Sequence, residues 1–177
     1  MDSSKNVILA AMFIALCFVT SLDALGSEYP IGSGNDDWWI TYPDDSSESG
    51  KEVSHPQWVL AALEDKPVLI YIHKTCEGCG PQTEAIVEVV NEYDNELVYF
   101  NLSGEGDDAR ANEAGIVYDP NEGLRHYVPM TIILTVMRSP DGKDHVIWHS
   151  ADQPTGKEWI ESYIEDAISL HNEAMSK

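Results

Sequence analysis

The sequence contains few basic residues. Its 177 residues include 10 lysines and arginines against 31 aspartates and glutamates, which gives a formal net charge of −21 at pH 7. A surface that binds nucleic acid needs clustered lysine and arginine to replace the counterions, so nucleic acid is excluded as a partner. The acidity is typical of a solvated protein surface, and it also fits a surface that attracts a cationic partner.

Cysteine is also scarce, because the chain contains only Cys17, Cys76 and Cys79. Small exported domains that depend on disulfides for stability carry more bridges than this, so a disulfide-stapled mini-domain is excluded. Hydrophobic residues make up 43% of the chain and include five tryptophans, enough to build a packed core. The length fits one domain of ordinary size with additional segments.

Long hydrophobic runs are absent. The 13 apolar residues 7–19 are too few for a membrane span, which needs about 20, and they suit the core of a signal peptide. Small residues at Ala24 and Gly26 favour cleavage before Ser27. We therefore expect residues 1–26 to be a signal peptide, or an uncleaved anchor that touches the membrane only through residues 7–25. Either alternative predicts an exported protein that is periplasmic, extracellular or lumenal.

Residues 27–52 are rich in Gly, Ser, Asp and Glu, which predicts an acidic linker. Within this segment, residues 38–42 (WWITY) have high β propensity. We expect them to add an edge strand or to cover apolar surface on the domain that follows.

From residue 53 to 177 the pattern alternates between strands and helices. Ser54 is the expected N-cap of the first helix, and Gly115 is expected to end a short helix that starts near Asp107. Strands are predicted at 68–72, 97–102, 130–137 and 144–149. Helices are predicted near 54–65, from the segment after the cysteines to Tyr93, and over 107–115 and 159–168. This order predicts an α/β domain with a central mixed β-sheet and helices on both faces.

The four residues Cys76-Glu77-Gly78-Cys79 follow an apolar strand and open a helix. Three interpretations fit such a pair: a redox centre, part of a metal site, or a structural disulfide. The N–H groups and the dipole of the helix favour a thiolate over a thiol, which suits redox exchange. His73, Cys76 and Cys79 could begin a Cu or Zn site, but no second cysteine pair completes it. A disulfide across two residues would constrain the unfolded chain very little.

Two further segments accompany the cysteine pair. Residues 127–131 (YVPMT) open a predicted strand, and residues 111–117 (ANEAGIV) precede them as a helix. With the cysteine pair, these segments resemble the thioredoxin-like superfamily over about residues 53–169, two thirds of the chain. The resemblance implies a thioredoxin-like fold and thiol–disulfide oxidoreductase activity. It implies that Cys76 attacks, that Cys79 resolves, and that Val128 and a cis Pro129 dock the substrate.

The chain departs from thioredoxins proper in three places. Those proteins have Trp before the first cysteine, Gly-Pro between the cysteines, and a buried Asp six residues upstream. This chain has Thr75, Glu77-Gly78 and Ile70 at these positions. His73 and Glu77 are then the nearest candidates to accept the proton of Cys79, and the charge of Glu77 opposes a thiolate beside it.

The resemblance implies cysteine-containing protein substrates outside the cytoplasm and a second redox protein as partner. It implies no cofactor other than the redox-active disulfide Cys76–Cys79, and we expect a monomer. Whether substrates are oxidised, reduced or isomerised depends on the redox potential and the partners. The alternative is a non-catalytic binding module that holds its partner through the acidic surface, Trp38-Trp39 and the segment 118–126.

Overall fold

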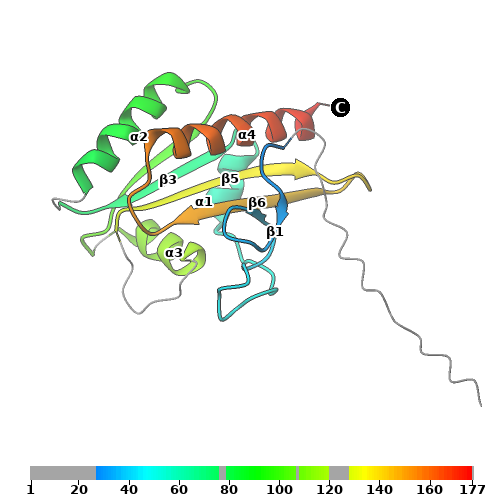
Figure 1. Cartoon of the computed structure of the whole chain (residues 1–177), viewed down its shortest axis with the longest axis horizontal. Helices are drawn as coiled ribbons and strands as arrows, with labels where there is room; N and C mark the ends of the chain where they lie inside the picture. The colour runs from blue at the N-terminus through cyan, green and yellow to red at the C-terminus, as the bar shows by residue number, and fades with distance from the viewer. Residues whose placement is uncertain (1–26, 76–78, 107, 120–127, 177) are drawn as a thin grey trace, which may run out of the picture.

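A computed structural model describes residues 27–75, 79–106, 108–119 and 128–176. These residues form one mixed α/β unit whose elements follow the predicted order (Figure 1). The elements are β1 (Ile31–Gly32), β2 (Trp38–Trp39), α1 (Gln57–Leu63), β3 (Val68–His73), α2 (Gly80–Glu92), β4 (Val98–Ser103), α3 (Ala109–Tyr118), β5 (Met130–Arg138), β6 (Asp144–Ala151) and α4 (Lys157–Met175).

The strands form a six-stranded sheet in the order β1-β2-β6-β5-β3-β4. Strand β3 lies between β4, to which it is parallel, and β5, to which it is antiparallel. Strand β6 pairs antiparallel with β5, and β2 pairs antiparallel with β6. The prediction of a mixed sheet is therefore confirmed, and β3 is the neighbour of the edge strand β4.

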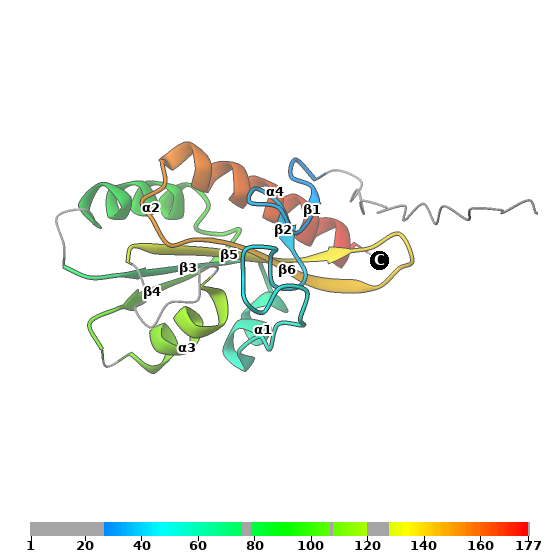
Figure 2. The same cartoon turned by 60° about the horizontal axis from the view of Figure 1, so that its bottom comes forward.

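Helices cover both faces of the sheet, as predicted (Figure 2). Helices α2 and α4 pack on one face, where they share a core with Leu69 and Tyr71 of β3. Helices α1 and α3 pack on the other face, together with Val68, Ile70 and Ile72. Because successive strand residues point to opposite faces, both faces being covered explains why β3 is apolar without alternation.

Two helix ends differ from the sequence prediction. Helix α1 is preceded by Pro56 at the N-cap position, two residues after the expected Ser54. Helix α3 does not end at Gly115 but continues to Tyr118, whose side chain is fully buried. Burial of Tyr118 in the core stabilises the extra turn, and such tertiary packing outweighs the weak helix propensity of glycine.

Residues 27–52 pack against the rest of the unit, unlike the linker that their composition predicts. Trp38 is fully buried, and Trp39 pairs with β6 across from Trp148, so a strand forms over two residues. It is not the expected edge strand, because β1 pairs with its other side and is itself the edge of the sheet. The buried carboxylate of Asp166 on α4 accepts hydrogen bonds from the Trp38 indole at 2.7 Å and the Glu28 backbone N–H at 2.9 Å. The polar residues that suggested a linker form the turns between these few buried aromatic side chains.

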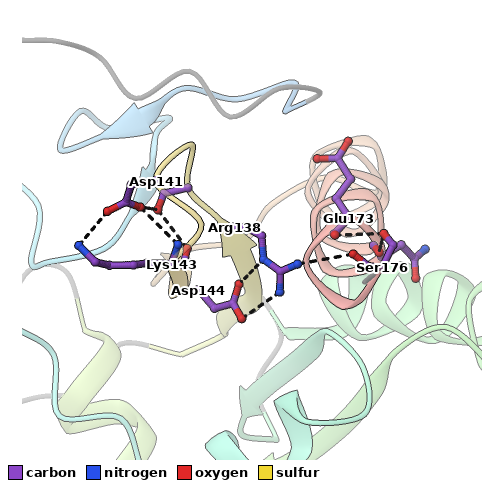
Figure 3. Close-up of polar contacts among 8 residues, drawn as sticks. Arg138, Asp141, Lys143, Asp144, Glu173 and Ser176 are labelled. Atoms are coloured by element: carbon purple, nitrogen blue, oxygen red, sulfur yellow. Dashed lines mark hydrogen bonds and ion pairs between the residues drawn. The ribbon is translucent and has the colours of Figure 1, made fainter.

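The β5–β6 hairpin turns at residues 139–142, as predicted, with Gly142 at a φ of +82°. At its base, Arg138 contacts both carboxylate oxygens of Asp144, at 2.8 and 3.1 Å (Figure 3). Arg138 also donates to the Ser176 carbonyl oxygen at 3.5 Å, which connects the hairpin to the end of α4.

The predicted signal peptide or anchor, residues 1–26, lies outside the described residues. In the ranges that are described, none of the helices combines the length and the apolarity that a membrane-spanning segment requires.

Candidate functional site

Cys79 lies at the point where the connection from β3 enters α2. It is the N-cap residue of α2, and its side chain is buried, with 2% of the residue exposed. Its carbonyl oxygen accepts hydrogen bonds from the Thr83 hydroxyl at 2.8 Å and from the Tyr71 hydroxyl at 3.3 Å. The first bond comes from α2 and the second from β3, so both elements fix the backbone of Cys79.

Val128 and Pro129 precede β5 and lie beside the last residues of β3. Met130, the next residue, pairs with Ile72, and the Val128–Pro129 peptide bond is cis, as the resemblance implies. A Cβ atom at Gly104 would lie 3.2 Å from Val128 Cγ1 and 3.3 Å from the His73 carbonyl oxygen. A larger residue at position 104 would therefore crowd Val128 and the end of β3, which glycine avoids.

Gln82 joins the first turn of α2 to the start of β5. Its side chain is buried, and Nε2 donates to the hydroxyls of Thr131 at 2.9 Å and Thr155 at 2.8 Å. Its Oε1 atom accepts the backbone N–H of Thr155 at 2.8 Å. Because Gln82 follows Cys79 by three residues and Thr131 follows Pro129 by two, these bonds hold the two predicted site segments together.

We expect Gln82→Leu to lower the free energy of unfolding by about 1–3 kcal/mol, because leucine leaves the Thr155 N–H and two hydroxyls without their partner. Urea unfolding followed by circular dichroism measures this change. The matched control is Gln57→Leu at the start of α1, where the side chain is exposed. That exposed substitution should change stability by less than about 0.5 kcal/mol. Equal effects of the two substitutions would show that the buried bonds of Gln82 contribute nothing.

His73, one of the two candidate proton acceptors, lies at the end of β3. Its ring stacks on Tyr71 with a centroid distance of 4.9 Å. Its Nε2 atom lies 2.7 Å from Oδ1 of Asn101, an oxygen that only accepts, so Nε2 carries a proton. That nitrogen is therefore engaged with β4.

Glu105 holds the connection that leads from β3 to the cysteine pair. Its carboxylate accepts the backbone N–H of Thr75 at 3.0 Å, and this hydrogen bond lowers the pKa of Glu105. Neither Gln82 nor Glu105 was predicted as a site residue. The sequence could have indicated only Glu105 as a site residue, because it follows a glycine at the end of a strand. Gln82 resembles any polar residue of a helix.

An open pocket of about 620 Å³ lies beside Cys79, along the first turns of α2. Val87 in its wall is a large apolar side chain that is half exposed. The described lining residues are His73, Lys74, Thr75, Cys79, Gly80, Thr83, Glu84, Val87 and Glu88. The structure thus brings His73 and Cys79 into the lining of one pocket. This pocket is next to the end of β3, where Val128 and Pro129 also lie.

The other predicted site residues, Cys76 and Glu77, lie outside the described residues, as does most of the segment 118–126. Within the described part of the chain, no group of three or more His, Cys, Asp or Glu side chains could hold a metal ion.

Trp38 and Trp39 are buried, so they do not form the exposed docking patch of the binding-module alternative.

Comparison with known proteins does not identify a family. No protein-family model matches the chain, and no curated protein matches it. A solved structure described as "Structure of a malarial protein" is similar over 58% of this chain and 97% of its own length. It has 11% sequence identity and a TM-score of 0.42. A likeness this weak says nothing about what this chain binds or catalyses.

Proposed function

We propose that this chain is an exported thiol–disulfide oxidoreductase with a thioredoxin-like fold, acting on cysteine-containing proteins through Cys76 and Cys79. The observation that carries the proposal is the position of Cys79. It is buried at the start of α2, and Gln82 ties this turn to β5 directly after Val128 and Pro129. A helix start provides free N–H groups and the positive end of a dipole, which favour a thiolate.

The arrangement of the elements supports the proposed fold. In thioredoxin-like proteins the cysteine pair lies between an apolar strand and a helix, and a cis-proline loop lies against the pair. Here β3, Cys79 and α2 follow one another, and a cis Val128–Pro129 bond precedes β5, the antiparallel neighbour of β3. The backbone at Val128 is then the proposed contact for an extended substrate segment.

The proposed reaction is an exchange in two steps. The thiolate of Cys76 attacks one sulfur of a substrate disulfide, forms a mixed disulfide and releases the other sulfur as a thiolate. Cys79 then loses its proton and attacks the Cys76 sulfur, which releases the second substrate thiolate and leaves the Cys76–Cys79 disulfide. The substrate gains two electrons and the cysteine pair loses two. The reverse sequence oxidises a substrate dithiol, and a dithiol or disulfide partner protein resets the pair.

Equilibration in glutathione buffers of graded potential, followed by thiol alkylation and intact mass measurement, tests this function. We expect Cys76 and Cys79 to gain two alkyl groups together over one transition, because a dithiol–disulfide couple transfers two electrons. The same spectra report the mass of the mature chain, and so whether residues 1–26 are removed. Two thiols that stay alkylated at every potential would contradict the proposal.

A metal carrier using His73, Cys76 and Cys79 remains the alternative with a different chemistry. It predicts that the purified protein contains Cu or Zn in a one-to-one ratio and loses it in His73→Ala. In the exchange mechanism His73→Ala leaves the two-electron transition in place, so elemental analysis and alkylation of this variant separate the two functions.

A further inference from the structure

A second pocket, of about 360 Å³, lies where the N-terminal segment meets the end of β6 and the start of α4. Its lining contains carboxylates and aromatic rings, and no lysine or arginine occurs among its described lining residues. We call it the acidic aromatic pocket, and the residues that matter are Asp36, Trp39, Asp45, His149, Asp152 and Trp159. None of these residues takes part in the proposed exchange reaction.

Two of the carboxylates in this pocket have no partner among the side chains that the structure describes. Asp36 and Asp45 are exposed, and neither carboxylate forms an ion pair or hydrogen bond with another described side chain. Carboxylates beside a concave, low-dielectric wall create a local negative potential that raises the concentration of cations. The pocket therefore favours a positively charged ligand.

His149 presents a hydrogen-bond acceptor to the same pocket. The residue is 3% exposed, and its ring lies between Trp39 and Tyr163, at centroid distances of 4.3 and 4.4 Å. Nδ1 lies 2.8 Å from the Asp37 carbonyl oxygen, which only accepts, so Nδ1 carries the proton. Burial lowers the pKa of His149 to about 4, so the ring is neutral at pH 7.

The Nε2 atom of His149 is then a lone-pair acceptor without a donor among the described residues. No described residue bonds to it, and Nε2 is not among the buried side-chain atoms that lack a partner, so it is open to the pocket. An acceptor that opens into a pocket can take its hydrogen bond from the N–H of a ligand that enters there.

Trp159 supplies a partly exposed aromatic ring to the pocket, whereas Trp39 is buried and packs against His149. Trp39 is held in place by its indole N–H, which donates to the Gly34 carbonyl oxygen at 2.8 Å. Trp159 packs near His149 and Tyr163, at centroid distances of 5.6 and 4.8 Å. The π faces of tryptophan attract ammonium and guanidinium groups. The described side chains form no group suited to a metal ion, so the chemistry favours an organic cation.

We propose that the acidic aromatic pocket binds an organic cation with N–H groups, an ammonium or a guanidinium, which donates to His149 Nε2 and lies between Trp159 and the carboxylates. Such a group can come from a free amine or from a lysine or arginine side chain of a protein. The pocket wall is a neighbour of the proposed redox site in the sheet, because Ala151 pairs with Thr131, two residues after Pro129.

Titration of the ¹⁵N-labelled full chain in sodium phosphate at low ionic strength tests the proposal, with n-butylammonium, n-butylguanidinium, tetramethylammonium and neutral n-pentanol as probes. We expect the indole signals of Trp39 and Trp159 to shift with the first two probes, at dissociation constants of about 1 mM for ligands of this size. Tetramethylammonium has the charge but no N–H, so it should bind more weakly, and n-pentanol should not bind. Equal binding of tetramethylammonium would overturn the role of His149.

The variant Asp36→Asn with Asp45→Asn should weaken butylammonium binding about tenfold, because it removes two charges near the ligand. The matched control is Asp94→Asn with Glu96→Gln, which removes two charges in the turn after α2, outside the pocket lining. If both double variants weaken binding equally, the effect is one of net charge and the pocket is not a cation site. In His149→Phe the ring stacking is retained, and the preference for butylammonium over tetramethylammonium should disappear.

A capped Gly-Lys-Gly peptide distinguishes the two sources of the cation. Binding at least as tight as that of butylammonium supports a protein side chain as the occupant, whereas weaker binding with an intact butylammonium response supports a free amine. No response of the Trp39 and Trp159 signals to any cationic probe overturns the proposal. This outcome is independent of the exchange activity of Cys76 and Cys79, which the alkylation measurement tests separately.

Discussion

Replacing Cys76 by serine is expected to slow exchange with a model protein disulfide by on the order of a thousandfold, because a serine hydroxyl does not ionise near pH 7 and cannot attack sulfur. The measurement is the initial rate of insulin reduction by the prereduced protein. A Cys76→Ser variant that keeps the wild-type rate would exclude the proposed mechanism.

The Cys79→Ser variant provides the matched comparison. It keeps the attacking thiol and removes the resolving one, so the mixed disulfide between Cys76 and the substrate should accumulate and be visible as a covalent adduct. The burial of Cys79 fits this division of roles, since a buried thiol reacts with its neighbour more readily than with an incoming protein. A binding module would instead retain its function in the double variant of Cys76 and Cys79.

Trp38→Ala is expected to lower the free energy of unfolding by about 3–5 kcal/mol, as for other fully buried tryptophans. The substitution empties the space between the sheet and α4, ends the edge-to-face contact with Tyr163 and leaves the Asp166 carboxylate without its indole donor. This is a large share of the 5–15 kcal/mol that stabilises an ordinary domain. Urea unfolding of the full-length chain measures the loss.

Trp58→Ala is the control for the loss of a tryptophan elsewhere. Trp58 on α1 is only partly buried, and its indole N–H donates to the exposed Glu113 carboxylate, so its removal should cost less. Limited proteolysis gives an independent readout: residues 27–52 should resist cleavage in the wild type and become sensitive in Trp38→Ala. A loss below about 1 kcal/mol for Trp38→Ala would mean that this segment does not contribute to the core.

The α/β fold class could be predicted from the spacing of apolar residues along the sequence. Strand β3 was predictable because a short apolar run with branched and aromatic residues suits a strand that is covered on both faces. The hairpin was predictable from the turn residues 139–142, which restrict the backbone locally. The cis bond before Pro129 was expected from the resemblance, and the structure has it.

The helix ends and the role of residues 27–52 were not predictable in the same way. Gly115 has low helix propensity by itself, yet Tyr118 three residues later is buried, and the packing of that side chain continues the helix. Residues 27–52 have the composition of a linker, but two adjacent tryptophans bring the segment onto the sheet. Composition averages over residues, whereas a few buried side chains determine where such a segment packs.

The sequence by itself determined the alternation of strands and helices, the position of the cysteine pair between a strand and a helix, and the acidic character of the chain. Each of these depends on residues that are close in sequence. Only the tertiary structure decided that Gln82 joins the turn at Cys79 to the strand after Pro129. It also decided which side chains line one pocket together, namely those of Asp36, Trp39, Asp45, His149 and Trp159. These contacts join segments far apart in the chain, and no local pattern encodes them, because they form only when the sheet brings its strands together.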